Sequence, residues 1–257
     1  MNLTISSKFF SKMGSKISLK NCLIILFWIT VWQAADLFID NPILFAGPID
    51  IIQALAAQGG SPAFWATIFN SFFRISLGFF CAFFFGLLLG SLAYGCSLIK
   101  ELLAPLMITV RSVPVASFII LALIWIGSDH LAVFTSFLVV APMIYTSTLT
   151  GLEHTDPKLL EMAHIFRIPL IKKIRFIYVP SLLPYLINGC RLGLGMGWKS
   201  GVAAEVIGIP QSSIGEQLYY AKLYLDTASL FSWTFVIIIA SALFERLFLF
   251  LLKRIRH

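Results

Sequence analysis

The chain has 257 residues, of which 59% are hydrophobic and only 12% are charged, and its net charge is +7. A soluble domain of this size is about a quarter charged, so this chain lacks the polar side chains needed to cover a surface in water. The composition excludes a soluble enzyme, a nucleic-acid-binding module and a disordered tail. It predicts a surface that faces lipid.

Six apolar stretches are long enough to cross a membrane, which takes about 20 residues in a helix. In chain order they are 22–39, 64–94, 105–126, 131–152, 180–208 and 230–252. The second and fifth are long, so we expect them to tilt, bend or emerge from the bilayer. The first is too long for the core of a signal peptide, and we interpret it as an uncleaved span. The sequence therefore predicts an all-α membrane protein with six transmembrane helices.

Lysine and arginine alternate between the connections, and these residues favour the cytoplasmic side. The tail 1–21 has four of them, the connection 41–63 has none, and the connection 153–179 has five. The tail 253–257 has three. We therefore expect both tails and the connection 153–179 to be cytoplasmic, with residues 22–252 forming one transmembrane domain.

No pattern in the chain indicates catalysis or a bound cofactor. The four cysteines and four histidines form neither a CxxC pair nor an HExxH motif. The segment GLGMGWKS at 193–200 resembles a phosphate-binding loop, but Trp198 replaces its second glycine and the segment lies within an apolar span. We expect no metal, no catalytic residue and no nucleotide site in this chain.

The connection 153–179 opens with the segment HTDPKLLEMAHIFRIP, which predicts a short amphipathic helix. Asp156 is a good N-cap, Pro157 suits the first helical position, and Pro169 ends the helix. One side of this helix is apolar. Two interpretations remain open at this point: a helix that rests on lipid headgroups, and a helix that docks into another protein.

The same segment resembles the EAA-type cytoplasmic loop of the permease subunits of type I ABC importers. Residues 161–163 occupy the EAA positions, and 179–180 with 183–184 stand in for the Leu-Pro element. Arg167 stands where the family has glycine, which does not favour a sharp turn, and Pro169 is expected to supply the break. The residues that the resemblance assigns to the docking, or coupling, helix are Asp156, Pro157, Leu160, Glu161, Met162, Ala163, Phe166 and Arg167.

The resemblance extends from about residue 64 to the end, and the segment GWKSGVAAEVIG is most similar to the nitrate, sulfonate and taurine group. It implies a permease in the bacterial inner membrane, working with a second permease copy as a homodimer. It also implies two cytoplasmic ATP-binding subunits that use ATP-Mg and an extracytoplasmic solute-binding protein, and no nucleic acid. The permease itself would not be an enzyme. The alternatives are the same class carrying a vitamin precursor of pyrimidine or flavin type, and a self-contained secondary transporter or channel.

Charged residues within the fifth stretch suggest a solute path, because a charge inside a bilayer is costly and usually faces protein or water. Arg191, Trp198 and Glu205 recur every seven residues, and Lys199 lies about 80° from Arg191 around an ideal helix. We expect these four residues to line the translocation path or its gate. Ion pairs between helices and snorkelling near a helix end are the alternatives. The surplus of cations mildly favours an anionic solute.

Glycines repeat every fourth residue in the same stretch, at Gly189, Gly193, Gly197 and Gly201. Such a stripe permits very close helix packing. The sequence does not say whether the stripe faces a partner permease or a neighbouring span. Gly86 and Gly90 repeat the spacing once in the second stretch, where packing within the chain is expected.

The connection 209–229 predicts a second short helix, capped by Ser212 or Ser213, on the outer side. Its tyrosines either anchor the helix at the membrane interface or face the solute-binding protein.

Overall fold

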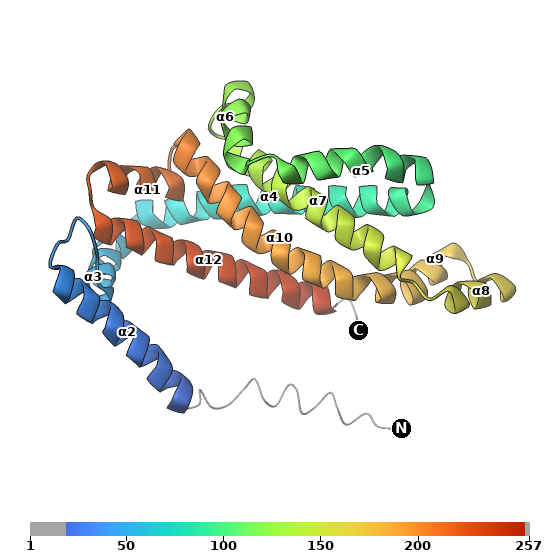
Figure 1. The fold of residues 1–257 in the computed structure, drawn as a ribbon, viewed down its shortest axis with the longest axis horizontal. Coiled ribbons are helices and arrows are strands. Elements are labelled where there is room, and N and C mark those ends of the chain that lie inside the picture. The colour runs from blue at the N-terminus through green and yellow to red at the C-terminus, as the bar shows by residue number, and fades with distance from the viewer. Residues whose placement is uncertain (1–18, 255–257) are drawn as a thin grey trace.

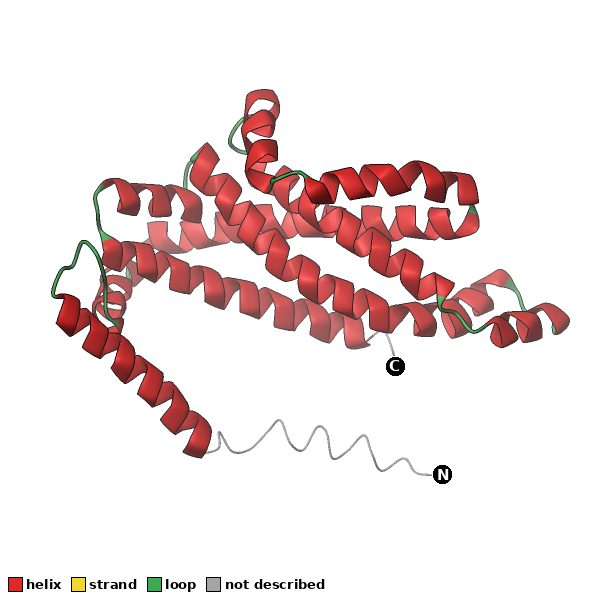
Figure 2. Ribbon diagram, viewed as in Figure 1, coloured by secondary structure: helices red, strands yellow, loops and turns green. Residues whose placement is uncertain are grey.

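The computed structural model describes residues 19–254, and within that range all regular structure is helical (Figures 1 and 2). The helices are α2 (Leu19–Ile39), α3 (Pro48–Gly59), α4 (Pro62–Gly95), α5 (Ser97–Ser112), α6 (Val115–Ile126), α7 (Leu131–Glu153), α8 (Pro157–Ile165), α9 (Leu170–Lys173), the π-helix η1 (Ile174–Tyr178), α10 (Val179–Gly208), α11 (Ile214–Leu223) and α12 (Thr227–Arg254). Of the predicted tails, residues 1–18 and 255–257 lie outside the described residues.

Helix α7 packs against both α4 and α10, and these three helices form the body of the molecule (Figure 1). On α4, a Cβ atom at Gly86 would lie 2.8 Å from the Cβ of Ile144, and one at Gly90 would lie 2.7 Å from the Cβ of Thr148. Any larger side chain would therefore push α4 away from α7. The prediction that these two glycines pack within the chain is confirmed.

The glycine stripe of α10 also faces α7, which answers the question that the sequence left open. A Cβ at Gly197 would lie 2.9 Å from Val140, and one at Gly201 would lie 2.6 Å from the Oγ of Ser136. Ser136 Oγ donates a hydrogen bond of 3.0 Å to the carbonyl oxygen of Gly197, across the two helices. The four glycines that meet α7 are Gly189, Gly193, Gly197 and Gly201.

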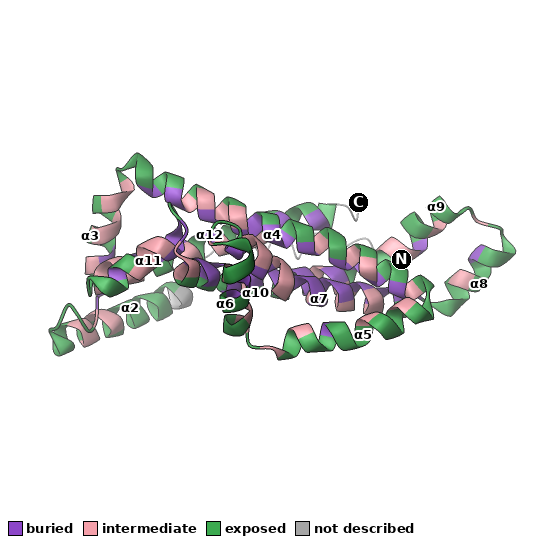
Figure 3. Cartoon of the chain, turned by 90° about the horizontal axis from the view of Figure 1, so that it is seen from above, coloured by how far each residue is buried: buried purple, intermediate pink, exposed green. Residues whose placement is uncertain are grey.

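Aromatic side chains fill the space between α4, α10 and α12. Trp198 is 2% exposed, and its ring lies 5.8 Å from that of Phe72. Phe79 meets Phe248 edge to face at 4.9 Å. Such pairs add about 0.5–1.5 kcal/mol beyond the area that they bury. Figure 3 shows the buried residues gathered where these helices meet, whereas α2 and α8 are mostly exposed.

Within the described residues, α2, α4, α7 and α12 are each long and apolar enough to cross a membrane. The predicted span 105–126 is wrong as a single helix, because α5 and α6 meet at an angle of 100°. Pro114 lies between them, and a proline disfavours the helical conformation of the residue before it. Helix α10 is long enough but less apolar. Six spans with cytoplasmic termini remain a prediction.

Helix α2 stands apart from the body of the molecule (Figure 1). None of its span Cys22–Ile39 is buried. Its contacts lie near its C-terminal half, where the Nε1 of Trp32 donates to the carbonyl oxygen of Ala46 at 3.1 Å and the ring of Trp32 lies 6.0 Å from that of Phe231. The fold therefore rests on the remaining helices.

The glycine contacts give a first prediction. Gly201→Leu should lower the thermal stability of the detergent-purified chain, because overpacking a tight contact costs about 1–3 kcal/mol. Gly195→Leu is the matched control, since a Cβ at Gly195 has no atom within 4 Å. Both changes gain the same helix propensity, so the difference between their midpoints of thermal aggregation measures the packing cost alone. Equal midpoints would contradict the role given to the stripe.

Candidate functional site

Helix α8 begins as the sequence predicts. The Asp156 side chain accepts a hydrogen bond of 2.9 Å from the backbone N–H of Lys158, and Pro157 is the first helical residue. The helix lies beyond the ends of α7 and α10, at what we call the α8 end of the bundle (Figure 1). Ile165 and Phe166 are 75% and 73% exposed. The segment therefore presents large apolar side chains away from the core.

The turn after α8 keeps its sharp form although Arg167 replaces glycine. Arg167 has a φ of +48°, in the left-handed region that favours glycine. The Ile168 N–H donates to the carbonyl oxygen of Ala163 at 2.9 Å, and the Arg167 N–H donates to that of His164 at 3.1 Å. The first of these is the long-range bond of a Schellman C-cap. The backbone thus ends α8 at Ile165 and turns at Arg167, two residues before the predicted break at Pro169.

The four α10 residues predicted to line a solute path lie in different surroundings. Arg191 is 56% exposed, and its Nε lies 3.7 Å from the Oε1 of Glu245 on α12. Trp198 is buried in the aromatic core, and Glu205 is fully buried. Lys199 is exposed. The structure therefore places two of the four in the interior of the chain and two at its surface, and does not bring them together on one open face.

Glu205 connects the end of α10 to the start of α11. Its Oε2 accepts hydrogen bonds from the Oγ of Ser71, at 2.7 Å, and from the N–H of Gly215, at 3.2 Å. The Ser71 Oγ in turn accepts from the N–H of Ile214 at 2.8 Å. The first N–H groups of a helix lack intrahelical partners and attract negative charge. A buried carboxylate in this position therefore fixes α11 against α4 and α10.

Sequence reasoning missed Ser71 and Gly215. Ser71 is 134 residues from its partner Glu205, and no periodicity relates the two helices. Gly215 is needed because a Cβ there would overlap the backbone of Glu205. The sequence gives no sign of that contact until α10 and α11 are placed together.

The predicted helix of the connection 209–229 is α11, and Ser213 is its N-cap. The Oγ of Ser213 accepts from the N–H of Glu216 at 3.0 Å, and the Ser212 N–H donates to the Oε2 of Glu216 at 2.7 Å. This end of the molecule, opposite α8, is called the α11 end below.

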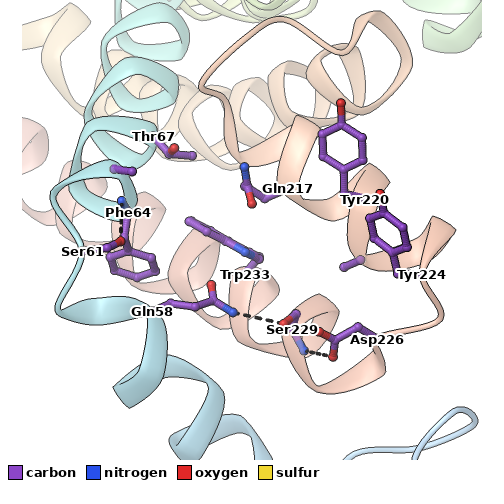
Figure 4. Close-up of a pocket in the computed structure, with 12 residues that line it drawn as sticks. Gln58, Ser61, Phe64, Thr67, Gln217, Tyr220, Tyr224, Asp226, Ser229 and Trp233 are labelled. Carbon is purple, nitrogen blue, oxygen red and sulfur yellow. Dashed lines mark hydrogen bonds between the residues drawn. The ribbon is translucent and has the colours of Figure 1, made fainter.

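A cavity of about 530 Å³ opens at the α11 end between α3, α4, α11 and α12 (Figure 4). Gln58 and Ser229 meet across it, the Nε2 of Gln58 donating to the Oγ of Ser229 at 3.0 Å. Tyr220 and Tyr224 stack on one wall with ring centroids 6.3 Å apart. The lining holds one carboxylate, that of Asp226, and neither lysine nor arginine. Such a wall does not attract anions.

The comparisons with known proteins agree with this architecture. Residues 82–257 match the model of a family described as the binding-protein-dependent transport system inner membrane component. The chain belongs to this family. It is therefore a permease subunit of an ABC importer and a multi-pass protein of the inner membrane.

Individual relatives of the permease are distant. It is 27% identical over 221 residues to the taurine transport system permease protein TauC of Escherichia coli, covering 83% of this chain and 80% of TauC. It is 25% identical over 191 residues to the nitrate import permease protein NrtB of Synechococcus elongatus, covering 70% and 68%. A chain of the inward-facing MetNI methionine ABC transporter matches with a TM-score of 0.63 at 15% identity, covering 76% of the permease and 99% of that chain. This last likeness shows the fold alone.

The turn at Arg167 gives a second prediction. Arg167→Gly should keep or increase the protection of the Ile168 amide, because glycine adopts the left-handed conformation without the steric cost, about 1–2 kcal/mol, that another residue bears. Arg167→Val should reduce that protection about tenfold. Arg175→Gly is the control for glycine at a helical position, and it should lower the protection of η1. Hydrogen exchange of residues 163–178 measures all three. Loss of protection in Arg167→Gly would show that the arginine side chain holds the turn.

The Glu205 contact gives a third prediction. Glu205→Ala should expose the first turn of α11 to hydrogen exchange, because it leaves the Ser71 hydroxyl and the Gly215 N–H without acceptors, at a cost of about 1–3 kcal/mol. Glu205→Gln keeps an oxygen acceptor and should retain most of the protection. If both variants exchange like the parent, the carboxylate does not fix α11.

Proposed function

We propose that this permease forms, with a second copy of itself, the translocation path of an ATP-driven importer, and that α8 docks into a separate ATP-hydrolysing subunit. The observation that carries the proposal is the apolar surface of α8, which projects from the α8 end of the bundle on a capped helix. Ile165 and Phe166 together expose an area that a partner would cover. ATP hydrolysis in that partner would supply the free energy of transport.

Docking at α8 would move the bundle as a unit. Helix α8 follows α7 after a three-residue turn, and α9 and η1 lead directly into α10. Because the glycine contacts hold α7 and α10 at close distance, a displacement of α8 reaches both helices together. This is the rigid-body form of conformational change, and in the proposal it opens the path alternately to the two sides of the membrane.

The remaining partners follow from the same architecture. In the proposed arrangement six spans place both termini and α8 in the cytoplasm, and a solute-binding protein delivers the solute at the α11 end. The solute is a small anion such as a sulfonate, taurine or nitrate. The names of TauC and NrtB support this class, as does Lys199 of α10, which has no carboxylate within 4.0 Å among the described residues. ATP-Mg binds to the partner subunit.

The docking proposal gives a fourth prediction. Phe166→Asp and Glu161→Arg should reduce co-purification of the ATP-binding subunit at least tenfold, with normal insertion of the permease. Phe166→Asp places a negative charge in the proposed interface, and Glu161→Arg replaces a negative charge there by a positive one. Tyr224→Asp is the matched control: it introduces the same charge at a residue that is 74% exposed at the α11 end. Quantitative pull-down from the same membranes compares all three variants, and solute uptake is compared between the two α8-end variants and the parent only.

Two outcomes would contradict the proposal. Uptake that persists without ATP and without an associated ATP-binding subunit would assign the chain to secondary transport. Uptake of an uncharged vitamin precursor in place of taurine or nitrate would keep the importer and reject the anion.

A further inference from the structure

Two adjoining cavities follow the surface where α5, α7 and α10 meet. The first, of about 450 Å³, is lined on α7 by Pro142, Thr146 and Ser147 and on α5 by Arg111. The second, of about 280 Å³, shares Thr146 and Ser147 and continues toward the α8 end. Together they form a groove, here called the α7–α10 groove, that starts near the middle of α7 and runs along half of its length.

Arg111 is held in the wall of the first cavity without an acidic partner. Its Nη2 donates to the carbonyl oxygen of Pro142 at 2.6 Å and to the Oγ1 of Thr146. Among the described residues no carboxylate lies within 4.0 Å of its guanidinium. A guanidinium has five N–H donors, so most of its donors are free to bind a ligand in the groove.

Three other cations of the helices differ from Arg111 in this respect. Among the described residues, Arg74 pairs with Asp129 at 3.7 Å, Lys100 with Glu153 at 2.6 Å, and Arg191 with Glu245 at 3.7 Å. These three are neutralised by acids of the same chain. A charge without such a partner in a membrane is costly and marks a polar pathway.

Lys199 lies on the same face of α10 as the groove. Leu192 and Met196 line the first cavity, and Lys199 follows them at the spacing that keeps residues on one side of a helix. It is exposed, and among the described residues it also has no carboxylate within 4.0 Å. Lys199 thus lies toward the α11 end on the face of α10 that borders the groove, and Arg111 of α5 faces the groove at mid-depth.

The second cavity continues the groove with neutral hydrogen-bonding groups. It is lined by the hydroxyls of Thr146, Ser147, Thr150 and Tyr185 and by the amide of Asn188. The Thr146 hydroxyl already donates to the carbonyl oxygen of Pro142 at 2.9 Å. The other groups donate hydrogen bonds to anionic oxygens and do not hold them as a fixed positive charge does. A strong site at Arg111 followed by weaker donors allows an anion to bind and then to leave.

We propose that the α7–α10 groove carries a small oxyanion from mid-depth toward the α8 end and that Arg111 is the residue that binds it at mid-depth. The inference rests on the proposed import function and adds to it the route and the recognising residue. Arg191, Trp198 and Glu205 then have no place on the route, since they face α12, the aromatic core and α11.

Thiol accessibility tests the route without an identified solute. The four native cysteines are replaced by alanine, and Met196→Cys is introduced into the groove of the full-length chain in membrane vesicles. The probes are two methanethiosulfonate reagents of similar size, one with a sulfonate and one with a trimethylammonium group. After division by their rates with a small thiol in solution, the sulfonate reagent should react about tenfold faster, because Met196 lines the same cavity as Arg111, whose positive charge attracts the sulfonate.

Three variants assign this preference to the guanidinium. In Met196→Cys, a second change Arg111→Gln should abolish the preference, Arg111→Lys should retain it, and Arg74→Gln should leave it unchanged because that cation is already paired. Phe84→Cys is the control for lipid exposure. It lies near Gly86, which packs against α7 at Ala141, and its side chain is 64% exposed; it should react with neither reagent.

The outcomes separate the two proposals. An unreactive Met196→Cys would show that lipid or protein fills the groove, and an equal reaction with both reagents, or a preference that survives Arg111→Gln, would overturn the role of Arg111. None of these rates needs ATP or the partner subunit. A failed pull-down at α8 therefore counts against the import function alone.

Discussion

Close packing of α7 against glycines is the constraint on which the rest of the structure depends. In lipid there is no hydrophobic force between helices, so association rests on the closeness of contact and on hydrogen bonds. Gly86 and Gly90 of α4 and the α10 stripe supply that closeness, and Ser136 adds a hydrogen bond to the backbone of Gly197. A glycine costs a helix about 1 kcal/mol against alanine, and here the cost is offset by contact along the helices.

Four of the predicted spans, now α2, α4, α7 and α12, and the start of α8 could be predicted because they depend on local chemistry. Apolar length sets the spans, and Asp156 with Pro157 sets the first turn of α8. The break at Pro114 was missed because hydropathy ignores backbone restrictions, although the proline was visible in the sequence. The left-handed turn at Arg167 could not be predicted, because arginine disfavours a positive φ. The backbone hydrogen bonds of Arg167 and Ile168 stabilise the turn, and they are visible only in the structure.

Whether the residues predicted to line the solute path are open or covered could not be predicted from the sequence. A spacing of seven placed Arg191, Trp198 and Glu205 on one side of α10, but whether that side is open depends on what covers it. Phe72 covers Trp198 and Ser71 reaches Glu205, and neither neighbour is visible in the sequence of α10. Arg111 was not singled out from the sequence, because its distance from the nearest acid is a property of the fold. Sequence gives the charges, and the structure shows which of them are neutralised.

Helix α10 joins the two ends of the molecule in one continuous element of 30 residues. At the α8 end it follows η1, and at the α11 end the Glu205 carboxylate fixes it to the start of α11. A helix transmits displacement along its axis with little loss because its backbone bonds form one ladder. In the proposed mechanism a movement of α8 therefore reaches α11, where a solute would arrive, through the same helix whose face borders the groove. The buried carboxylate is thus better placed to couple the two ends than to contact the solute.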